Sequence, residues 1–375
     1  MKVCFVTPHL TGGNSHPNER LGGTLEGTAR LTHELATRLR DLGHTVVAIT
    51  TGPEENIPKT QRNYQLKTLG DSFSFRNLSE LRTLVRSIRP DIIHFHGGEL
   101  MSYFATLLGP EGPPKIFTFT FVPSVARQSN NITHRSMLLI LSKLRQLKMK
   151  RMAPFAHAIA LSEFAREELE RELPGVPVSV VRYGVAEQYL SPTEPRIDEC
   201  GNDVICTSGL TSERGFDTFL SSIPIIEEKF HDVNFMATLR EFKENPKVPK
   251  TLRLLGPGAF IDLVRSRSIV LMPFSKHVAI DPPLSLVECM ALGKTVISTS
   301  IGSIPEILDM NRGRVVHPRD PIALAHITCE LLENRSLRTS IGRNAREFVT
   351  KQYDWNLALW SIQRIYAHAV SGAAS

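Results

Sequence analysis

Short apolar runs alternate with helix-periodic stretches along almost the whole chain. The runs are VCFVT, TVVAIT, IIHFH, IFTFTF, AIAL and VSVVR in the first half, and DVICTS, VNFMATL, LRLLG, SIVLMPF, TVIST and RVVHP in the second. Helical stretches lie between them, such as 25–42, where Leu31, Leu35, Leu39 and Leu42 form one stripe. Strands that alternate with helices predict parallel sheets covered by helices on both faces, and here the rhythm occurs twice.

The length agrees with two domains, because 375 residues are too many for one ordinary core. A polar, proline-containing stretch over 186–200 is the predicted linker. We therefore predict a first domain over 1–187 and a second over 200–354. A last helix over 355–372 has an apolar stripe and is predicted to pack elsewhere than in a third domain.

Composition limits the cellular setting. The chain has no run of eighteen apolar residues, and its amino terminus MKVCFVTPHL lacks the pattern of a secretory signal. The five cysteines form no CxxC pair, so neither a disulfide framework nor a zinc site is predicted. We expect a cytoplasmic protein without a nucleic-acid partner.

Positive charge is concentrated in one segment. The net charge is +6, yet no Asp or Glu occurs between Glu111 and Glu163, where eight Lys and Arg residues stand. Within it, residues 135–152 carry apolar side chains at helical spacing with basic residues between them. This pattern is typical of a helix on an anionic membrane surface, here the inner face of the membrane, and equally of a core helix with a solvated basic face. The sequence leaves both interpretations open.

Two tandem sheets of this kind are expected to present the carboxyl ends of their strands to a shared cleft that binds the ligand. No phosphate-binding loop of the G-x-x-x-x-G-K-[ST] type occurs, and LGGTLEG lacks the G-x-G-x-x-G spacing. ATP and nicotinamide nucleotides are therefore disfavoured. Gly22 and Gly23 would still let the backbone approach an anion at the start of the helix near Leu25, unless they form a plain loop.

An ordered set of motifs then points to a family. The segments GGTLEGTARLTHELATRLRDLGHTVVAIT, PDIIHFHG, ALSEFAREEL, SERGFDTFL, SLVECMALGKTVIST, GSIPEIL and YDWNLALWSIQRIY together resemble family 4 of the retaining glycosyltransferases, which have the GT-B fold. The resemblance implies two Rossmann-like domains facing a cleft, the first binding the acceptor and the second the nucleotide-sugar donor. It also implies a C-terminal helix that crosses back to the first domain, with no divalent metal and no cofactor besides the donor substrate.

The diphosphate of such a donor needs cations or oriented amides, because it leaves as charge develops on the sugar. Arg214, beside Gly215 after the first strand of the second domain, is one candidate. A helix predicted to start near Pro283 offers the free amides of Leu284, Ser285, Leu286 and Val287. Glu288, one turn further, corresponds to the family's carboxylate that accepts hydrogen bonds from the ribose. The alternatives are an exposed loop arginine and an acidic residue that complements the helix dipole.

The sequence departs from the family pattern at three points. Ile280 stands where the family has a first glutamate facing the sugar, and the adjacent Asp281 is the candidate substitute. Thr120 stands where a strand-ending histidine is expected. Ser208 and Gly209 replace a Gly-Arg pair, so one phosphate-binding cation is missing.

His94 and His96 are predicted to point to the same side of one strand near its carboxyl end. A metal pair would need further ligands, so we assign His96 to a sugar pocket instead, as the family implies.

The resulting hypothesis is a glycosyltransferase in which His96, Asp281 and Arg214 act on the sugar and its leaving group, with a sugar or lipid-linked acceptor. A GT-B subunit that binds a nucleotide sugar or a partner enzyme without transfer activity is the main alternative. A nucleotide-sugar epimerase of the same architecture is a third, against which the loss of the first glutamate counts.

Overall fold

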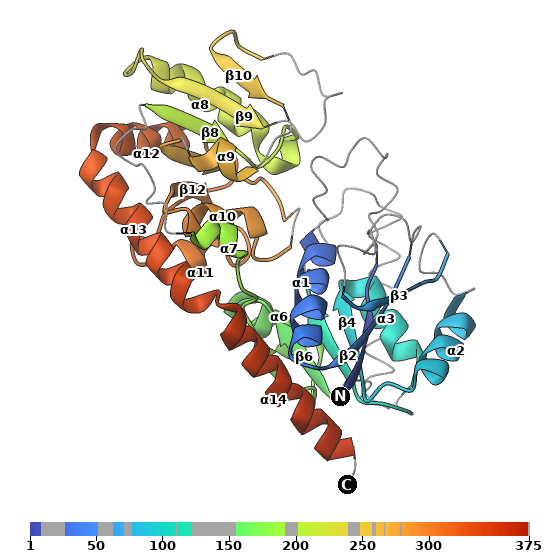
Figure 1. The fold of residues 1–375 in the computed structure, drawn as a ribbon. Coiled ribbons are helices and arrows are strands. Elements are labelled where there is room, and N and C mark those ends of the chain that lie inside the picture. Colours follow the sequence, from blue (N-terminus) through green and yellow to red (C-terminus); the bar gives the residue numbers. More distant parts are fainter. Residues whose placement is uncertain are drawn as a thin grey trace. The chain divides into compact units, whose positions relative to one another are not determined.

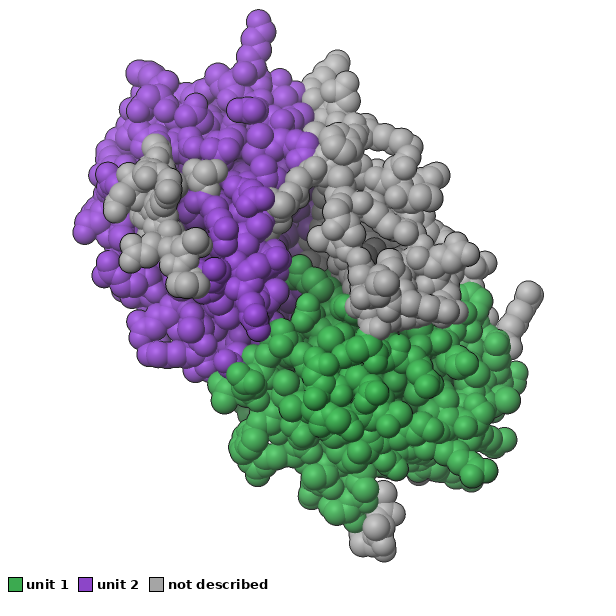
Figure 2. Space-filling model, viewed as in Figure 1, with its two compact units in different colours: residues 1–17, 24–183, 355–375 green, residues 18–23, 184–354 purple. Residues whose placement is uncertain are grey.

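The structure is a computed structural model that describes residues 1–8, 27–51, 63–70, 77–109, 111–121, 155–191, 202–238, 248–256, 260–265, 267–277 and 280–373. The chain forms two compact units (Figure 2). The first contains the described residues up to Tyr183 together with those from Trp355 onward, and the second contains Gly184–Asp354. The last helix thus returns to the first unit, as predicted.

In its described part, the first unit contains a seven-stranded parallel sheet with the order β3-β2-β1-β4-β5-β6-β7 (Figure 1). Its strands are β1 (Lys2–Val6), β2 (Thr45–Thr50), β3 (Gln65–Thr68), β4 (Ile92–Gly97), β5 (Lys115–Phe119), β6 (His157–Ala160) and β7 (Val178–Val180). Its helices are α1 (Gly27–Asp41), α2 (Leu78–Ile88), α3 (Glu99–Leu107), α6 (Glu163–Glu172) and α14 (Trp355–Ala373). All residues of β4 are buried because helices cover both faces of a parallel sheet.

The second unit repeats this plan with a six-stranded parallel sheet, again counted over described residues, of order β10-β9-β8-β11-β12-β13. Its strands are β8 (Asp203–Cys206), β9 (Asn234–Thr238), β10 (Leu252–Leu255), β11 (Ile269–Met272), β12 (Thr295–Thr299) and β13 (Arg314–Val316). Its helices are α7 (Glu187–Leu190), the 3-10 helix η6 (Ser212–Arg214), α8 (Phe216–Glu227), α9 (Phe260–Arg265), α10 (Leu284–Ala291), α11 (Ile304–Leu308), α12 (Pro321–Glu333) and α13 (Arg335–Gln352). Both sheets therefore have the strand order of a dinucleotide-type α/β fold.

Each predicted apolar run coincides with a strand, but one strand was missed. β3 is short and reads QLKT, and only Leu66 in it is buried. It pairs with β2 alone at the edge of the sheet. An edge strand that buries one side chain has no hydrophobic pattern to detect.

The chain enters the second unit earlier than the predicted linker, at Gly184. Val185 and Tyr189 are buried in the core of the second unit, and the Val185 amide donates to the Tyr353 carbonyl at 3.1 Å. The stretch was predicted to be a linker because it is mostly polar, yet two of its side chains pack in this core. Residues 192–200 lie outside the described part of the chain.

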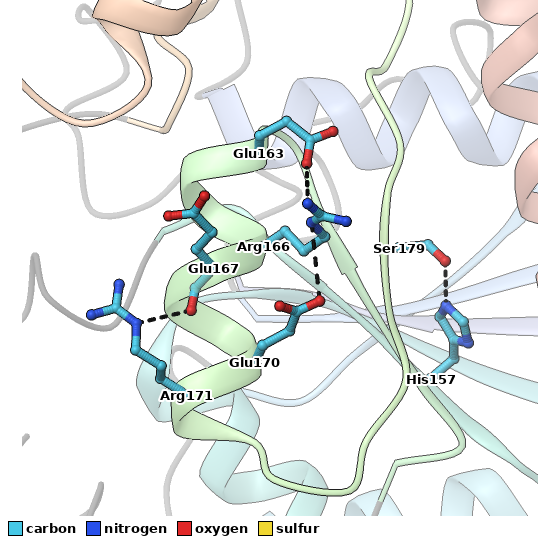
Figure 3. Close-up of polar contacts among 7 residues, drawn as sticks. All are labelled: His157, Glu163, Arg166, Glu167, Glu170, Arg171 and Ser179. Atoms are coloured by element: carbon cyan, nitrogen blue, oxygen red, sulfur yellow. Dashed lines mark hydrogen bonds and ion pairs between the residues drawn. The ribbon is translucent and has the colours of Figure 1, made fainter.

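Helix α6 illustrates how little the surface ion pairs contribute. The Ser162 hydroxyl caps the helix by accepting from the Ala165 amide at 3.0 Å. Arg166 lies 2.8 Å from Glu163 and 4.0 Å from Glu170 (Figure 3). These side chains are 42–53% exposed, so each pair contributes at most about 1 kcal/mol. The cap and the apolar face stabilise this helix more than its charges do.

Two histidines lie in the centre of the first unit. His94 and His96, on β4, are both 0% exposed, and their ring centroids lie 4.5 Å apart on the same side of the strand, as predicted. Burial lowers the pKa of His96 to about 3. Burial, and after it His96, hold the pKa of His94 well below its ordinary value of 6.5. Both rings are therefore neutral in the folded protein.

We expect the free energy of unfolding to fall as the pH drops below 6.5, the ordinary histidine pKa. In the unfolded chain both histidines take up a proton below that value, whereas in the folded chain they stay neutral, so acid favours unfolding. The slope reaches about 1.4 kcal/mol per pH unit for each histidine. Denaturant titrations between about pH 7.5 and 5.5 measure it, above the range in which ordinary carboxyls titrate.

The control is the double variant His94→Gln/His96→Gln. It is less stable at neutral pH, because the glutamines do not reproduce the hydrogen bonds, but its stability changes less with pH over the same window. An equally steep profile in the variant would assign the acid sensitivity to other groups.

Candidate functional site

The strand order of the second unit reverses between β8 and β11, and two connections leave the sheet there. The Ser275 and Lys276 amides, just after β11, donate to the Glu213 carbonyl in η6 at 3.0 and 3.2 Å. Gly215 approaches so closely that a Cβ on it would lie 1.6 Å from the Pro273 carbonyl oxygen. Its φ of +80° also suits glycine. The two connections are therefore packed together at the carboxyl edge of the sheet.

Arg214 lies in the first of these connections, at the end of η6. The side chain is half-buried, and its Nη1 donates to the Ser208 carbonyl at 3.0 Å. Ser208 and Gly209 thus occupy the turn that follows β8, and the guanidinium holds this turn in place. Arg214 therefore lies on a loop that is hydrogen-bonded to the segment leading to α10.

Helix α10 begins at Leu284 after Pro283, where the sequence predicted it. Of the four predicted amides, those of Leu286 and Val287 are used within the first turn, since they donate to the Pro283 carbonyl at 3.0 and 3.4 Å. The prediction that all four amides are free is therefore wrong for Leu286 and Val287, whose amides are already hydrogen-bonded to the residue before the helix. Among the described residues, no backbone acceptor is found for the Leu284 and Ser285 amides.

Glu288 lies one turn into α10. It is 6% exposed, and Cys289 and Met290 beside it are fully buried. Burial, and after it the charge of Glu288, raise the pKa of the Cys289 thiol well above its ordinary value. The carboxylate is therefore held inside the unit and not on a solvated helix face.

Asp281 lies in the loop before α10 and is 3% exposed. Its Oδ1 accepts hydrogen bonds from the Ser303 amide at 3.1 Å and the Ser303 hydroxyl at 2.6 Å. Burial raises the pKa of Asp281, while these bonds and the charge of His277 lower it in part. The carboxylate thus fixes the turn before α11, and this is a different arrangement from an open sugar-facing carboxylate. Contact of Asp281 with a sugar stays a prediction.

A pocket lies at the entrance of α10. It is lined by Phe274, Lys276, His277, Ile280, Asp281, Pro283, Ile301 and Ile304. Ile280, at the position of the missing glutamate, is 6% exposed and adds to its apolar wall. The Asp281 Oδ2 is buried, and the described residues provide no hydrogen-bond partner for it.

Sequence reasoning missed Lys276. Its Nζ lies 3.6 Å from the Glu213 carboxylate, one residue from Arg214, and its side chain is 21% exposed. A lysine in the loop after a buried strand can be noticed in the sequence, but a loop has no periodic pattern that would predict where its side chains lie. Lys276 supplies a second positive charge at the edge where the family's Gly-Arg pair is replaced.

The predicted residues of the first unit are arranged differently. His96 is 0% exposed, and both ring nitrogens have partners: Nδ1 lies 2.7 Å from the Thr32 hydroxyl and Nε2 lies 3.2 Å from the Tyr183 hydroxyl. This burial counts against contact with a sugar, which remains a prediction. Thr120 is also fully buried, and its hydroxyl lies 3.0 Å from that of Thr28.

Some predictions fall outside the described residues. They are the anion site at Gly22 and Gly23 and the basic segment 135–152. Within the described part of the chain, no group of three or more His, Cys, Asp or Glu side chains could hold a metal ion. No described helix is both long and apolar enough to span a membrane.

Two family models match the chain in order, Glycosyltransferase Family 4 over residues 25–189 and Glycosyl transferases group 1 over residues 201–334. The gpi3 subunit of phosphatidylinositol N-acetylglucosaminyltransferase from Schizosaccharomyces pombe is 22% identical, over 89% of this chain and 75% of that protein.

A GDP-mannose-dependent alpha-(1-6)-phosphatidylinositol monomannoside mannosyltransferase from Mycobacterium tuberculosis is 26% identical, over 41% of this chain and 44% of that protein. The Anabaena protein HepE, solved in complex with UDP-glucose, superposes with a TM-score of 0.71 at 15% identity, over 99% of this chain and 100% of that one. At this identity the likeness shows the fold. The family matches and the two Rossmann-like units together establish that the chain belongs to the glycosyltransferases of family 4 type, with the GT-B fold.

Proposed function

We propose that this glycosyltransferase transfers a sugar from a nucleotide-sugar donor to an acceptor hydroxyl, with retention of configuration at the transferred carbon. The observation that carries the proposal lies at one edge of the second sheet. The Lys276 amide donates to the Glu213 carbonyl, next to Arg214, and Lys276 lines one pocket with Pro283, the residue before α10. Open parallel sheets bind ligands at this edge, where the strand order reverses. The fold neighbour solved with UDP-glucose supports a nucleotide sugar as the ligand.

The diphosphate is the part of the donor that this edge suits best. It carries several negative charges, and charge shifts further onto it as the bond to the sugar breaks. Arg214 offers a planar fork for phosphate oxygens and Lys276 a point charge. The Leu284 and Ser285 amides add oriented dipoles at a helix start. Because two cationic side chains lie at this edge, we propose that transfer needs no divalent metal.

We propose that Glu288 binds the ribose. Close to a diphosphate its charge would be repelled, so it must face a neutral part of the nucleotide. It lies one turn below the helix start and is almost fully buried. A ribose offers two neutral hydroxyls that can donate to a carboxylate.

We propose a lipid-linked acceptor at a membrane surface, on the cytoplasmic side. Two relatives carry phosphatidylinositol in their names. The segment 135–152 has the sequence pattern of a basic amphipathic helix. An enzyme that modifies a lipid headgroup needs to reach the membrane surface.

A second candidate is a donor-binding subunit without transfer activity. The observation that favours it is the state of Asp281, whose carboxylate is bound to Ser303 next to an isoleucine at the position of the family's glutamate. A protein that binds the nucleotide but lacks a carboxylate near the sugar would retain affinity and lose turnover.

Replacing Arg214 by alanine is expected to lower the affinity for UDP or GDP at least about tenfold, because a charge on the diphosphate is lost. Arg214→Lys keeps the charge without the fork and is expected to lose less. Isothermal calorimetry with both nucleotides measures the change. The matched control is Arg253→Ala, an exposed arginine on the edge strand β10. Equal affinities in all variants would remove Arg214 from the site.

Turnover decides between the two candidates. Wild-type protein is titrated with a panel of UDP- and GDP-sugars and then assayed for donor hydrolysis. We expect Glu288→Ala to weaken nucleotide binding by about tenfold, since two hydrogen bonds to a carboxylate are lost, and to reduce hydrolysis with it. Binding without any hydrolysis favours the subunit, and a failure to bind every donor contradicts both candidates.

The membrane proposal predicts that the protein sediments with anionic liposomes and that salt releases it. Changing Lys148, Lys150 and Arg151 to glutamine is expected to reduce the bound fraction several-fold, because each basic residue near the surface contributes about 1 kcal/mol.

Changing three exposed basic residues of α13, Arg335, Arg343 and Lys351, to glutamine is the control with the same change in net charge. An equal loss in both triple variants would point to general attraction by the whole protein. Binding that responds to neither salt nor substitution would remove the segment from the surface.

A further inference from the structure

Side chains from four elements of the first unit, together with Tyr183 after β7, form an unbroken series of hydrogen bonds. The series runs Tyr366 hydroxyl to His94 Nδ1 (2.6 Å), His94 Nε2 to Thr118 hydroxyl (2.8 Å), Thr118 to Tyr183 hydroxyl (3.0 Å), Tyr183 to His96 Nε2 (3.2 Å), His96 Nδ1 to Thr32 hydroxyl (2.7 Å) and Thr32 to the Thr28 carbonyl (2.8 Å). It joins α14, at the end of the chain, to the first turn of α1. We call it the His94–His96 series.

Water has no access to the members of the series. Tyr366, His94, Thr118, His96 and Thr32 are 0% exposed, and Tyr183 is 5% exposed. An unpaired donor at such a depth is strongly unfavourable. Each hydrogen of the series must therefore find its acceptor within the series, and this requirement determines where every proton lies.

The direction of donation along the series is determined at its α1 end. The Thr32 hydroxyl has one hydrogen, and its acceptors are the Thr28 carbonyl at 2.8 Å and, more distantly, the Thr7 hydroxyl at 3.5 Å. A carbonyl can only accept. Thr32 therefore receives its bond from His96, so that the His96 hydrogen is on Nδ1.

The remaining protons follow in turn. With its hydrogen on Nδ1, His96 accepts at Nε2 from the Tyr183 hydroxyl. Tyr183 has then used its hydrogen and accepts from Thr118. Thr118 in turn accepts from His94, whose hydrogen is on Nε2. His94 accepts at Nδ1 from Tyr366. All these hydrogens have an acceptor.

The opposite direction fails at the other end. If Thr32 donated to His96, each bond would reverse, and Tyr366 would accept from His94. The Tyr366 hydrogen would then need another acceptor, and the described residues supply none besides His94. Tyr366 is completely buried, so the reversed series leaves one buried donor unpaired.

We propose that the His94–His96 series is a one-directional hydrogen-bond relay that fixes His94 as the Nε2–H tautomer and His96 as the Nδ1–H tautomer, and through them positions the first turn of α1 from α14. Thr28, where the relay ends, also contacts Thr120 at the carboxyl edge of the sheet. Tyr366 and Tyr183 are in this sense positioning residues for that edge. The inference is independent of the donor site in the second unit.

The wild-type protein provides the first test. With ¹⁵N-labelled histidine, long-range ¹H–¹⁵N correlations distinguish protonated from unprotonated ring nitrogens, and His94→Gln and His96→Gln variants assign the signals. We expect a protonated Nε2 on His94 and a protonated Nδ1 on His96 at neutral pH. Any other pair of tautomers, or a doubly protonated ring, overturns the proposal without need of further variants.

The second test asks whether the relay acts as a unit. Thr32→Val has the same shape and removes the acceptor of His96. Either direction then leaves one buried donor unpaired, so both directions become populated. His94, which Thr32 does not contact, is expected to show signals of both tautomers. If His96 changes while His94 keeps a single tautomer, each ring is set by its own neighbours and the relay is refuted.

Thr37→Val is the matched control, because Thr37 lies on the same helix with a buried hydroxyl outside the series. It is expected to leave both tautomers unchanged. Tyr366→Phe is a second variant should Thr32→Val fail to fold. It removes only a donor at the start of the relay, so every remaining hydrogen keeps its acceptor and both tautomers are expected to persist.

Discussion

The parallel pairing of β8 with β11 is the interaction on which the candidate donor site depends. Their register places Ile269 opposite Val204 and Leu271 opposite Cys206. The strands that follow β8 are added on one side and those that follow β11 on the other, so the two connections diverge from neighbouring strand ends. Two loops and the start of a helix therefore meet at one point, and polar groups from segments distant in sequence are gathered there.

The loops after β8 and β11 come close together because one contributes a glycine and because their backbones are hydrogen-bonded to each other. Gly215 approaches the Pro273 carbonyl more closely than any side chain would allow. The Glu213 carbonyl accepts two amides from the facing loop, so these three backbone groups are satisfied within the protein. The paired loops hold Arg214 and Lys276 at the same edge of the sheet, so the proposed diphosphate would meet charges that are already positioned.

The first unit uses the same architecture with different polar chemistry. Its sheet also reverses order, between β1 and β4. Here the buried histidines of β4 are neutral and bonded to threonine and tyrosine hydroxyls, whereas the second unit gathers charged side chains. Burial explains the difference: a neutral imidazole satisfies one donor and one acceptor at no charge cost, and an ion at the same depth would have to be paired.

The sequence by itself determined the two parallel sheets and the start of α10, because apolar periodicity and a proline at a helix start are local signals. The return of the last helix was implied by the family resemblance and not by a local pattern. It also indicated Arg214 and Glu288, whose position relative to a strand or a helix start is local too. It did not indicate β3, Lys276 or the bond between Asp281 and Ser303. These depend on which segments become neighbours: an edge strand buries one side chain, a loop has no period, and a carboxylate binds whichever amide the fold brings to it. The partners of His94 and His96 were decided by tertiary structure alone, since Tyr366 lies 272 residues from His94 in the chain.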